Sequence, residues 1–476
     1  MGRTQNLHRA DSYVAANVFH AHHQHVSGVN QPGRSNNIPE DLHCFPFVLP
    51  KTRAQLKIHA VWMRQPIAEL SRRLCFEYSA RHEKYNVSMA DELLRYRSQF
   101  PILERTTYLI SNSLGAMPKG VYEAMKGYAD TWATRGVRAW EERWWMLAAE
   151  VGAEIGTLMN APKGSVSTHQ NVTTCQAVVA SCFDFSGKRN KVVYSDLNFP
   201  SVMYFWEAQR AYGARVHMVP TDDGVTVPLE RLVDAIDEQT LLVPVSHVIF
   251  RSAYIQDAKA IIEKAHRVGA KVVLDTFQSL GTVPVDVQAL NVDFACGGVL
   301  KWLCGGPGVA YLYVRPDLGK TLQPKFTGWF AHENSFGFET GATRYAEPPF
   351  RFMNGTSHIP ALEAARPGLK IITEVGVDRI REKSQRQTAR LIELASQHGW
   401  PVNSPRNPEQ RGGTVSIDMP DAQEVCSALL KREILVDYRP KAGVRMSPHF
   451  YTRDEELETA IAAVEEILKE RSVTAR

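Results

Sequence analysis

The chain has 476 residues, 44% of them hydrophobic and 22% charged, which is the composition of an ordinary globular protein of about two or three domains. Basic residues exceed acidic ones by 55 − 51 = 4, a surplus too small to indicate a nucleic-acid partner. The longest apolar stretches are far shorter than the ~20 residues of a membrane span, and no secretory signal is visible near Met1. Seven cysteines occur singly, without a CxxC pair. We therefore expect a cytoplasmic protein without a disulfide framework, a bound metal or a membrane partner.

The first ninety residues differ from the rest of the chain. Residues 1–50 mix His, Asn, Gln, Pro and Ser without helical or strand periodicity. The tract HAHHQH, His20 to His25, has the composition of a metal-binding segment and equally that of a polar tail without function. We predict a partly disordered extension over residues 1–90.

From Thr107 onward, short β-rich runs alternate with helical segments. KVVYSDL and RVHMVP bracket a helical stretch, SVMYFWEAQRAYG. TLLVPVSHVIF is followed by the helical DAKAIIEKAHRVGA and then by KVVLDT, VDFACGG and VAYLYV. Strands separated by crossover helices predict an α/β fold with a mostly parallel sheet that is covered on both faces.

The last part of the chain has a different pattern. After residue 366 come a helix, TVSIDM, another helix, ILVDYR, VRMSP and a final helix from about Asp454. This order predicts a smaller α+β unit. We therefore expect a large domain over residues 91–365, whose N-terminal segment packs on a small C-terminal domain over residues 366–476.

Lys301 lies between a predicted strand and a glycine-rich turn, in GGVLKWLCGGPG. Burial disfavours the charged form of lysine, and a neutral lysine amine can form an imine with an aldehyde. A snorkelling surface lysine is the alternative if this residue is considered alone.

Asp275 ends the predicted strand KVVLD, at the edge of a parallel sheet where ligands bind. Pyridoxal phosphate (PLP) needs a carboxylate beside its ring nitrogen, because the protonated ring is the electron sink. A strand-end aspartate can also cap a helix. Lys301 follows 26 residues later at the end of the next predicted strand, and the two together predict a PLP site.

From about Thr107 to Tyr451 the chain resembles kynureninase within the class V aminotransferase group of PLP enzymes, which have fold type I. The resemblance rests on YLISNSLGAMP, NFPS, SHVIFRSAY, VVLDTFQSLGTVPVD, DFACGGVLKWLCGGPGVAYLYV, GWFAHENSFGF and VRMSPHFY. GWFAH and NSLG are more similar to kynureninase than to other branches. The resemblance implies a large domain with a seven-stranded sheet and a smaller C-terminal domain. It also implies an α-amino-acid substrate and a homodimer with an active site shared between subunits.

The resemblance also implies a role for each of several residues. Lys301 would be the catalytic Schiff-base lysine, and Asp275 would pair with the pyridine nitrogen. Arg445 would bind the substrate α-carboxylate by a bidentate pair, and Asn112 would line the substrate pocket. The other positions implied to bind the cofactor are Phe199 on its ring, Asn171, Val172 and Thr173 at its phosphate, Ser252 and Gln278 nearby, and Trp329 and Thr356 reaching the phosphate of the neighbouring subunit.

Three positions depart from kynureninase. Leu300 replaces a tyrosine proposed to act in proton transfer, Gln278 replaces a histidine, and Val202 replaces the aspartate of an FPSD motif. Kynurenine hydrolysis needs a second acid/base beside the lysine, and His332 and Tyr345 are the candidates to supply it.

The expected reaction is therefore kynureninase-like hydrolytic Cβ–Cγ cleavage. The alternatives are a class V aminotransferase, a C–S or β-lyase, or an epimerase that uses Lys301 alone, and a protein that has kept the fold without catalysis. Desulfurase activity is disfavoured because no cysteine lies between Cys304 and Cys426 to act as a mobile nucleophile. Trp140, Trp144, Trp145 and Arg138 are candidates for an aromatic-lined pocket, or else for core and dimer contacts.

Overall fold

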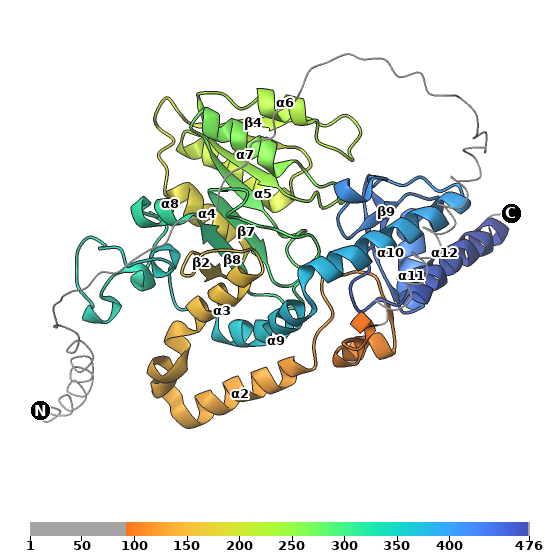
Figure 1. Cartoon of the computed structure of the whole chain (residues 1–476), viewed down its shortest axis with the longest axis horizontal. Helices are drawn as coiled ribbons and strands as arrows, with labels where there is room; N and C mark the ends of the chain where they lie inside the picture. Colours follow the sequence, from red (N-terminus) through yellow and green to blue (C-terminus); the bar gives the residue numbers. More distant parts are fainter. Residues whose placement is uncertain (1–91, 475–476) are drawn as a thin grey trace, which may run out of the picture. The chain divides into compact units, whose positions relative to one another are not determined.

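The computed structural model describes residues 92–474, so the predicted extension and its histidine tract lie outside the described part. Its centre is a seven-stranded sheet in the order β2-β8-β7-β6-β5-β3-β4 (Figure 1). All neighbouring strands are parallel except at β8, which is antiparallel to both β2 and β7. The strands are β2 (Val166–His169), β3 (Lys191–Ser195), β4 (Arg215–Val219), β5 (Thr240–Ser246), β6 (Lys271–Asp275), β7 (Phe294–Gly298) and β8 (Ala310–Val314).

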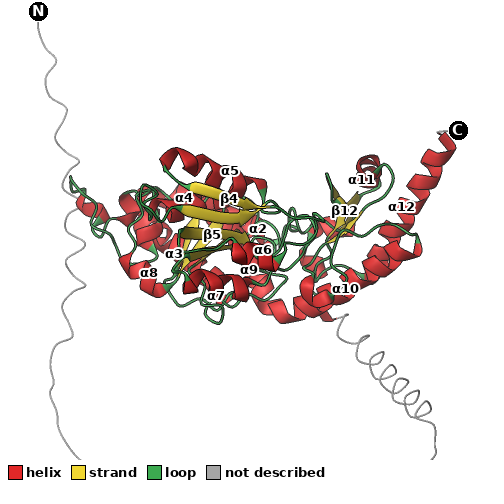
Figure 2. Ribbon diagram, turned by 90° about the horizontal axis from the view of Figure 1, so that it is seen from above, coloured by secondary structure: helices red, strands yellow, loops and turns green. Residues whose placement is uncertain are grey.

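Both faces of this sheet are buried, as the predicted α/β class requires. Successive side chains of a strand point to opposite faces. Val273 of β6 therefore belongs to a hydrophobic cluster with helices α4 and α5, while its neighbours Val272 and Leu274 belong to a cluster with α3, α7 and α9. Figure 2 shows α4 and α5 on one side of the sheet and α7 and α9 on the other. The helices around the sheet are α2 (Gly120–Arg135), α3 (Trp145–Thr157), α4 (Val172–Ser181), α5 (Pro200–Ala208), α6 (Leu229–Asp234), α7 (Ala258–Arg267), α8 (Pro316–Thr321) and α9 (Ile359–Val375).

A separate hydrophobic cluster forms around a three-stranded antiparallel sheet near the C-terminus. Its order is β11-β12-β9, and three helices contribute their apolar sides to the cluster. These elements are β9 (Val415–Ile417), β11 (Asp437–Arg439), β12 (Gly443–Met446), α10 (Val377–Gln397), α11 (Ala422–Lys431) and α12 (Asp454–Thr474).

The segment before α2 packs on this C-terminal unit. Strand β1 (Thr107–Tyr108) pairs in parallel with β10 (Ile434–Leu435). Arg97 forms an ion pair with Glu456 of α12 at 2.8 Å. The described part of the chain thus begins in contact with the C-terminal unit and then continues to the large sheet.

Two predicted boundaries differ from the observed elements. The run TLLVPVSHVIF is a strand only to Ser246, because the chain then turns and His247 N donates to Asp275 O at 2.8 Å. Helix α9 belongs to the cluster of the large sheet as far as Val375, and Ile380 of α10 belongs to it as well, so this cluster extends past residue 366. The division into two domains stays a prediction.

None of the helices within residues 92–474 is long and apolar enough to cross a membrane. The five cysteines of the described part, Cys175, Cys182, Cys296, Cys304 and Cys426, are all free thiols.

The turn that follows β7 is packed so closely that three glycines are needed around it. A Cβ at Gly115 would lie 2.2 Å from Lys301 O, and one at Gly281 would lie 2.9 Å from Trp302 O. A Cβ at Gly368 of α9 would lie 2.4 Å from Cys304 O. Three segments that are distant in the sequence therefore meet backbone to backbone at this turn.

We predict that Gly115→Ala lowers the free energy of unfolding by about 1–3 kcal/mol, because the carbonyl of Lys301 must move to admit a methyl group. The matched control is Gly127→Ala in α2, where an added Cβ meets no atom within 4 Å. Removing a glycine from a helix interior should raise stability there by about 0.5–1 kcal/mol. Denaturant titration of both variants measures the difference, and equal stabilities would contradict the close approach.

Candidate active site

A cavity of about 250 Å³ opens at the carboxyl ends of the parallel strands. This is the edge of an α/β sheet where ligands bind. Strands β3, β5, β6 and β7 each contribute residues at or just after their last position. The wall consists of Asn171, Val172, Thr173, Phe199, Ser201, Val202, Ser246, Val248, Phe250, Asp275, Phe277, Gln278, Leu300 and Lys301.

Lys301 is held at this cavity by the turn after β7. Burial lowers the pKa of its amine from 10.5 to about 8, against the opposing effect of Asp275. The charges of Arg445 and Arg439 lower the pKa further, and Asp437 raises it. Near neutral pH a useful fraction of this amine is therefore uncharged and nucleophilic.

Asp275 ends β6 and is 6% exposed. Its Oδ1 accepts a hydrogen bond from Phe277 N at 2.9 Å. Burial raises the pKa of this carboxyl group, and the bond from Phe277 and the charge of Lys301 lower it. Within residues 92–474 the carboxylate has no ion-pair partner closer than 4 Å, so a cationic ligand group would relieve the cost of burying it.

Two phenyl rings face the lysine amine. Nζ of Lys301 lies 4.3 Å from the ring centroid of Phe277 and 5.5 Å from that of Phe199. Gly298 makes room for the first ring, since a Cβ there would lie 2.5 Å from Phe277 Cζ. Phe277 was not among the site residues predicted from the sequence, although its position two residues after Asp275 could have indicated that it lies in the site.

The N-terminus of α4 forms another part of the wall. Asn171 caps this helix, and its Oδ1 accepts hydrogen bonds from Thr174 N at 2.9 Å and Thr174 Oγ1 at 3.2 Å. The next residues, Val172 and Thr173, have the free backbone N–H groups of a first helical turn. Such a turn attracts phosphate through these groups and the helix dipole.

Comparison with known proteins identifies the fold and the family. Residues 107–458 match the family model described as aminotransferase class-V. The chain belongs to the class V aminotransferase family.

Among its relatives, the chain is 34% identical over 368 residues to the uncharacterized aminotransferase YcbU of Bacillus subtilis (strain 168), covering 77% of this chain and 96% of that protein. It is 29% identical over 411 residues to the kynureninase of Bacillus anthracis, covering 83% of this chain and 95% of the relative. An apo cysteine desulfurase from Thermococcus onnurineus NA1 has a similar fold, with a TM-score of 0.70 and 24% identity over 79% of this chain and 98% of that one. The expected fold type I is thereby confirmed.

The cofactor of this enzyme is pyridoxal 5'-phosphate, and the cavity fits that group. Lys301 offers an amine with a lowered pKa for its aldehyde, and Asp275 offers a buried carboxylate without an ion-pair partner among the described residues. Phe199 and Phe277 present ring faces to a planar ring, and the first turn of α4 offers N–H groups to a phosphate.

Seven of the predicted site residues lie together in the cavity wall: Lys301, Asp275, Phe199, Asn171, Val172, Thr173 and Gln278. Gln278 uses both ends of its amide for protein contacts. Its Nε2 donates to Asn112 O at 2.9 Å, and its Oε1 accepts from Trp302 Nε1 at 2.9 Å. This side chain joins the segment of Asn112 to the turn of Lys301, and a direct cofactor contact stays a prediction.

Ser252 and Asn112 are not among the residues of the cavity wall. The hydroxyl of Ser252 is buried and donates to Val225 O at 2.6 Å, so its geometry gives no support to a cofactor contact. Ser246, the last residue of β5, lines the cavity instead. Asn112 is 1% exposed, and neither end of its side-chain amide has a hydrogen-bond partner among the described residues. A substrate-facing role for Asn112 stays a prediction.

Arg445 is already engaged by protein groups. Its Nε and Nη2 donate to the two oxygens of Asp437 at 2.7 and 2.5 Å, and its Nη1 donates to Phe250 O. Arg445 does not line the cavity, but its charge lowers the pKa of Lys301. Any substrate carboxylate on Arg445 must therefore use the N–H groups that Asp437 and Phe250 leave over.

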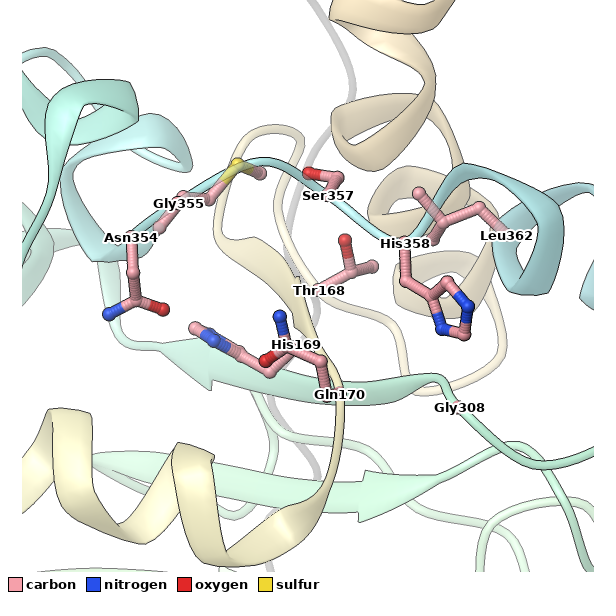
Figure 3. Close-up of a pocket in the computed structure, with 10 residues that line it drawn as sticks. Thr168, His169, Gln170, Gly308, Asn354, Gly355, Ser357, His358 and Leu362 are labelled. Carbon is pink, nitrogen blue, oxygen red and sulfur yellow. The ribbon is translucent and has the colours of Figure 1, made fainter.

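Trp329 and Thr356 lie apart from the lysine cavity. Trp329 packs edge-on against Trp145 at 5.4 Å, and Thr356 is exposed. The neighbours of Thr356, Gly355 and Ser357, line a second cavity of about 20 Å³, which has room for about one water molecule (Figure 3). The roles of Trp329 and Thr356 towards a neighbouring subunit stay predictions.

The tryptophans considered for a substrate pocket do not line the lysine cavity. Trp144 belongs to the core cluster, and Trp145 stacks on Phe330 at 4.3 Å. His332 and Tyr345 face each other in an isolated β-bridge outside the cavity, with Tyr345 Oη donating to Pro324 O at 2.8 Å.

We predict that the rate at which the apoprotein takes up PLP rises with pH and levels off with a midpoint near pH 8. The lysine amine must be uncharged to attack the aldehyde, and its pKa is lowered to about 8. Stopped-flow absorbance over a pH series gives the midpoint. A midpoint near 10.5, the ordinary pKa of lysine, would contradict the effect of burial.

Proposed function

We propose that this PLP-dependent enzyme is an aminotransferase that acts on an α-amino acid with an apolar side chain. When bound, PLP supplies an aldehyde for the substrate amine and an electron-accepting ring beside the α-carbon. One observation carries the proposal: among the cavity residues only Asp275 and Lys301 ionise between acid and alkaline pH.

Asp275 and Lys301 have different roles in this proposal. Asp275 is committed to the ring nitrogen, which leaves Lys301 to move protons at the substrate. Exchange of an amino group between an amino acid and a 2-oxo acid needs one such base at the α-carbon. Transamination therefore needs no group beyond those that the cavity wall contains.

The wall of the cavity also limits the substrate side chain. Val202, Val248, Phe250 and Leu300 are apolar, and Ser201 and Ser246 carry the only hydroxyl groups of the wall besides Thr173. No acidic or basic side chain of the wall remains to meet a charged substrate side chain. An uncharged, largely apolar side chain suits this surface best.

Kynureninase activity is the second candidate, supported by relatives with that name at 28–29% identity. Hydrolytic Cβ–Cγ cleavage needs a second acid/base, which neither Leu300 nor the rest of the wall supplies. His332 and Tyr345 lie in the same surface region as Trp329, outside the cavity. A second copy of the chain is therefore the remaining source of the second acid/base.

A homodimer is part of this proposal. Trp329, Phe336 and Phe338 form a surface aromatic group, with ring centroids of Trp329 and Phe338 6.5 Å apart and Phe338 75% exposed. An exposed group of this kind is typical of a protein interface. Light scattering of the PLP-loaded protein should give twice the mass of one chain, and Phe338→Asp should shift it towards one chain. A monomer that is fully active would contradict the shared site.

The reaction is tested by supplying the PLP-loaded protein with neutral L-amino acids and pyruvate. We predict stoichiometric alanine and 2-oxo acid, and loss of both products in Lys301→Ala, which should also lose the borohydride-reducible cofactor adduct. L-Kynurenine is tested in parallel by anthranilate fluorescence. Anthranilate from L-kynurenine, with no 2-oxo acid formed from the neutral amino acids and pyruvate, would replace transamination by cleavage. Colourless protein that takes up no PLP would contradict both.

A further inference from the structure

Arg445 has a second arginine beside it, and both share one carboxylate. Nη2 of Arg439 lies 3.1 Å from Asp437 Oδ2, the oxygen that also accepts from Arg445. Asp437 and Arg439 are both in β11, and β12 presents Arg445 directly opposite Asp437 in the antiparallel register. The three side chains therefore form one charge cluster.

The charge of this cluster does not cancel. Two guanidinium groups meet one carboxylate, so a single positive charge is left over. The side chains of Arg445 and Asp437 are 3% and 11% exposed and that of Arg439 is 41% exposed, so water reaches the surplus charge only from the side of Arg439. The cluster adjoins the lysine cavity, because Arg445 donates to the carbonyl of Phe250, which lines that cavity, and all three residues shift the pKa of the Lys301 amine.

The hydrogen bonds of Arg445 indicate which kind of ligand group would complete this cluster. A guanidinium group has five N–H bonds. Asp437 and Phe250 accept three of them, which leaves one N–H on each terminal nitrogen without a partner among the described residues. A carboxylate with two oxygens matches two such donors.

From these contacts we propose that Asp437 positions Arg445 and Arg439 so that together they bind one substrate carboxylate, and that the substrate carries no second acidic group. The inference rests on the proposed action on α-amino acids. It adds Arg439 as a binding residue and Asp437 as a positioning residue, and the charge of the cluster gives a second, independent reason for a substrate with a single carboxylate.

Three compounds of the same carbon skeleton test the substrate class with the PLP-loaded protein. These are L-norleucine, its amide, and L-2-aminoadipate, which carries a second carboxylate. Each is titrated while the cofactor absorbance is followed. We expect norleucine to bind at least about tenfold more tightly than either of the others, because the amide lacks the charge and aminoadipate brings one too many. Equal or tighter binding of aminoadipate would overturn the proposal.

Two variants test the residues. Asp437→Asn leaves two positive charges, so the preference for norleucine over aminoadipate should fall about tenfold or reverse, and Asp437→Glu should restore it. Arg439→Ala removes the surplus charge, so the preference for norleucine over its amide should fall. The Arg439 side chain is 41% exposed, so its removal should not unfold the protein. A loss of stability alone would weaken all three compounds equally.

The matched controls are Asp421→Asn and Arg471→Ala. These residues form an ion pair at 2.9 Å, with exposures of 53% and 43%, elsewhere on the C-terminal unit. Neither control should change the two preferences. Unchanged preferences in Asp437→Asn and Arg439→Ala would overturn the inference while leaving the proposed function intact. If none of the three compounds changed the cofactor absorbance of the unmodified protein, the action on α-amino acids would itself fail.

Discussion

The close backbone packing around the turn of Lys301 is the constraint on which the active site depends. Gly115, Gly281 and Gly368 come from three different segments, and each lies against a carbonyl oxygen of this turn. Van der Waals contact with backbone leaves the turn little freedom, since main-chain atoms cannot change rotamer to make room. The backbone position of Lys301 is thus fixed by the tertiary fold and not by the turn itself.

Burial acts on the two ionisable groups of the cavity in opposite directions. It lowers the pKa of the Lys301 amine and raises that of the Asp275 carboxyl group, so both are pushed towards their uncharged forms. A cofactor with a basic ring nitrogen and an aldehyde uses both tendencies. Lys301 would meet the aldehyde of the cofactor with its uncharged amine, and Asp275 would hold a proton beside the ring nitrogen. The same desolvation therefore serves two different parts of one ligand.

The sequence predicted those parts of the site that follow from strand order. Asp275 ends β6, Lys301 follows the neighbouring parallel strand β7, and Phe199 and Asn171 follow two others, so the sheet topology brings them to one edge. Contacts that depend on the three-stranded sheet β11-β12-β9 could not be predicted from the order of the strands in the sequence. Pairing of Arg445 with Asp437 requires the register of β11 and β12, which no single segment encodes. Phe277 was missed for a related reason, because its place beside the amine depends on the absence of a side chain at Gly298.

The loop after β5 links the charge cluster to the cavity. Phe250 lines the cavity with its ring, while its carbonyl accepts from Arg445. The next carbonyl, of Arg251, accepts from Ser416 Oγ in β9, and Gly412 N donates to Ala253 O at 2.7 Å. The carbonyl of Phe250 and any carboxylate that accepts from the remaining N–H groups of Arg445 would therefore be held by the same guanidinium group. Because Phe250 also meets Phe199 edge-on at 5.2 Å, Arg445 and the aromatic wall beside Lys301 are connected through one short loop.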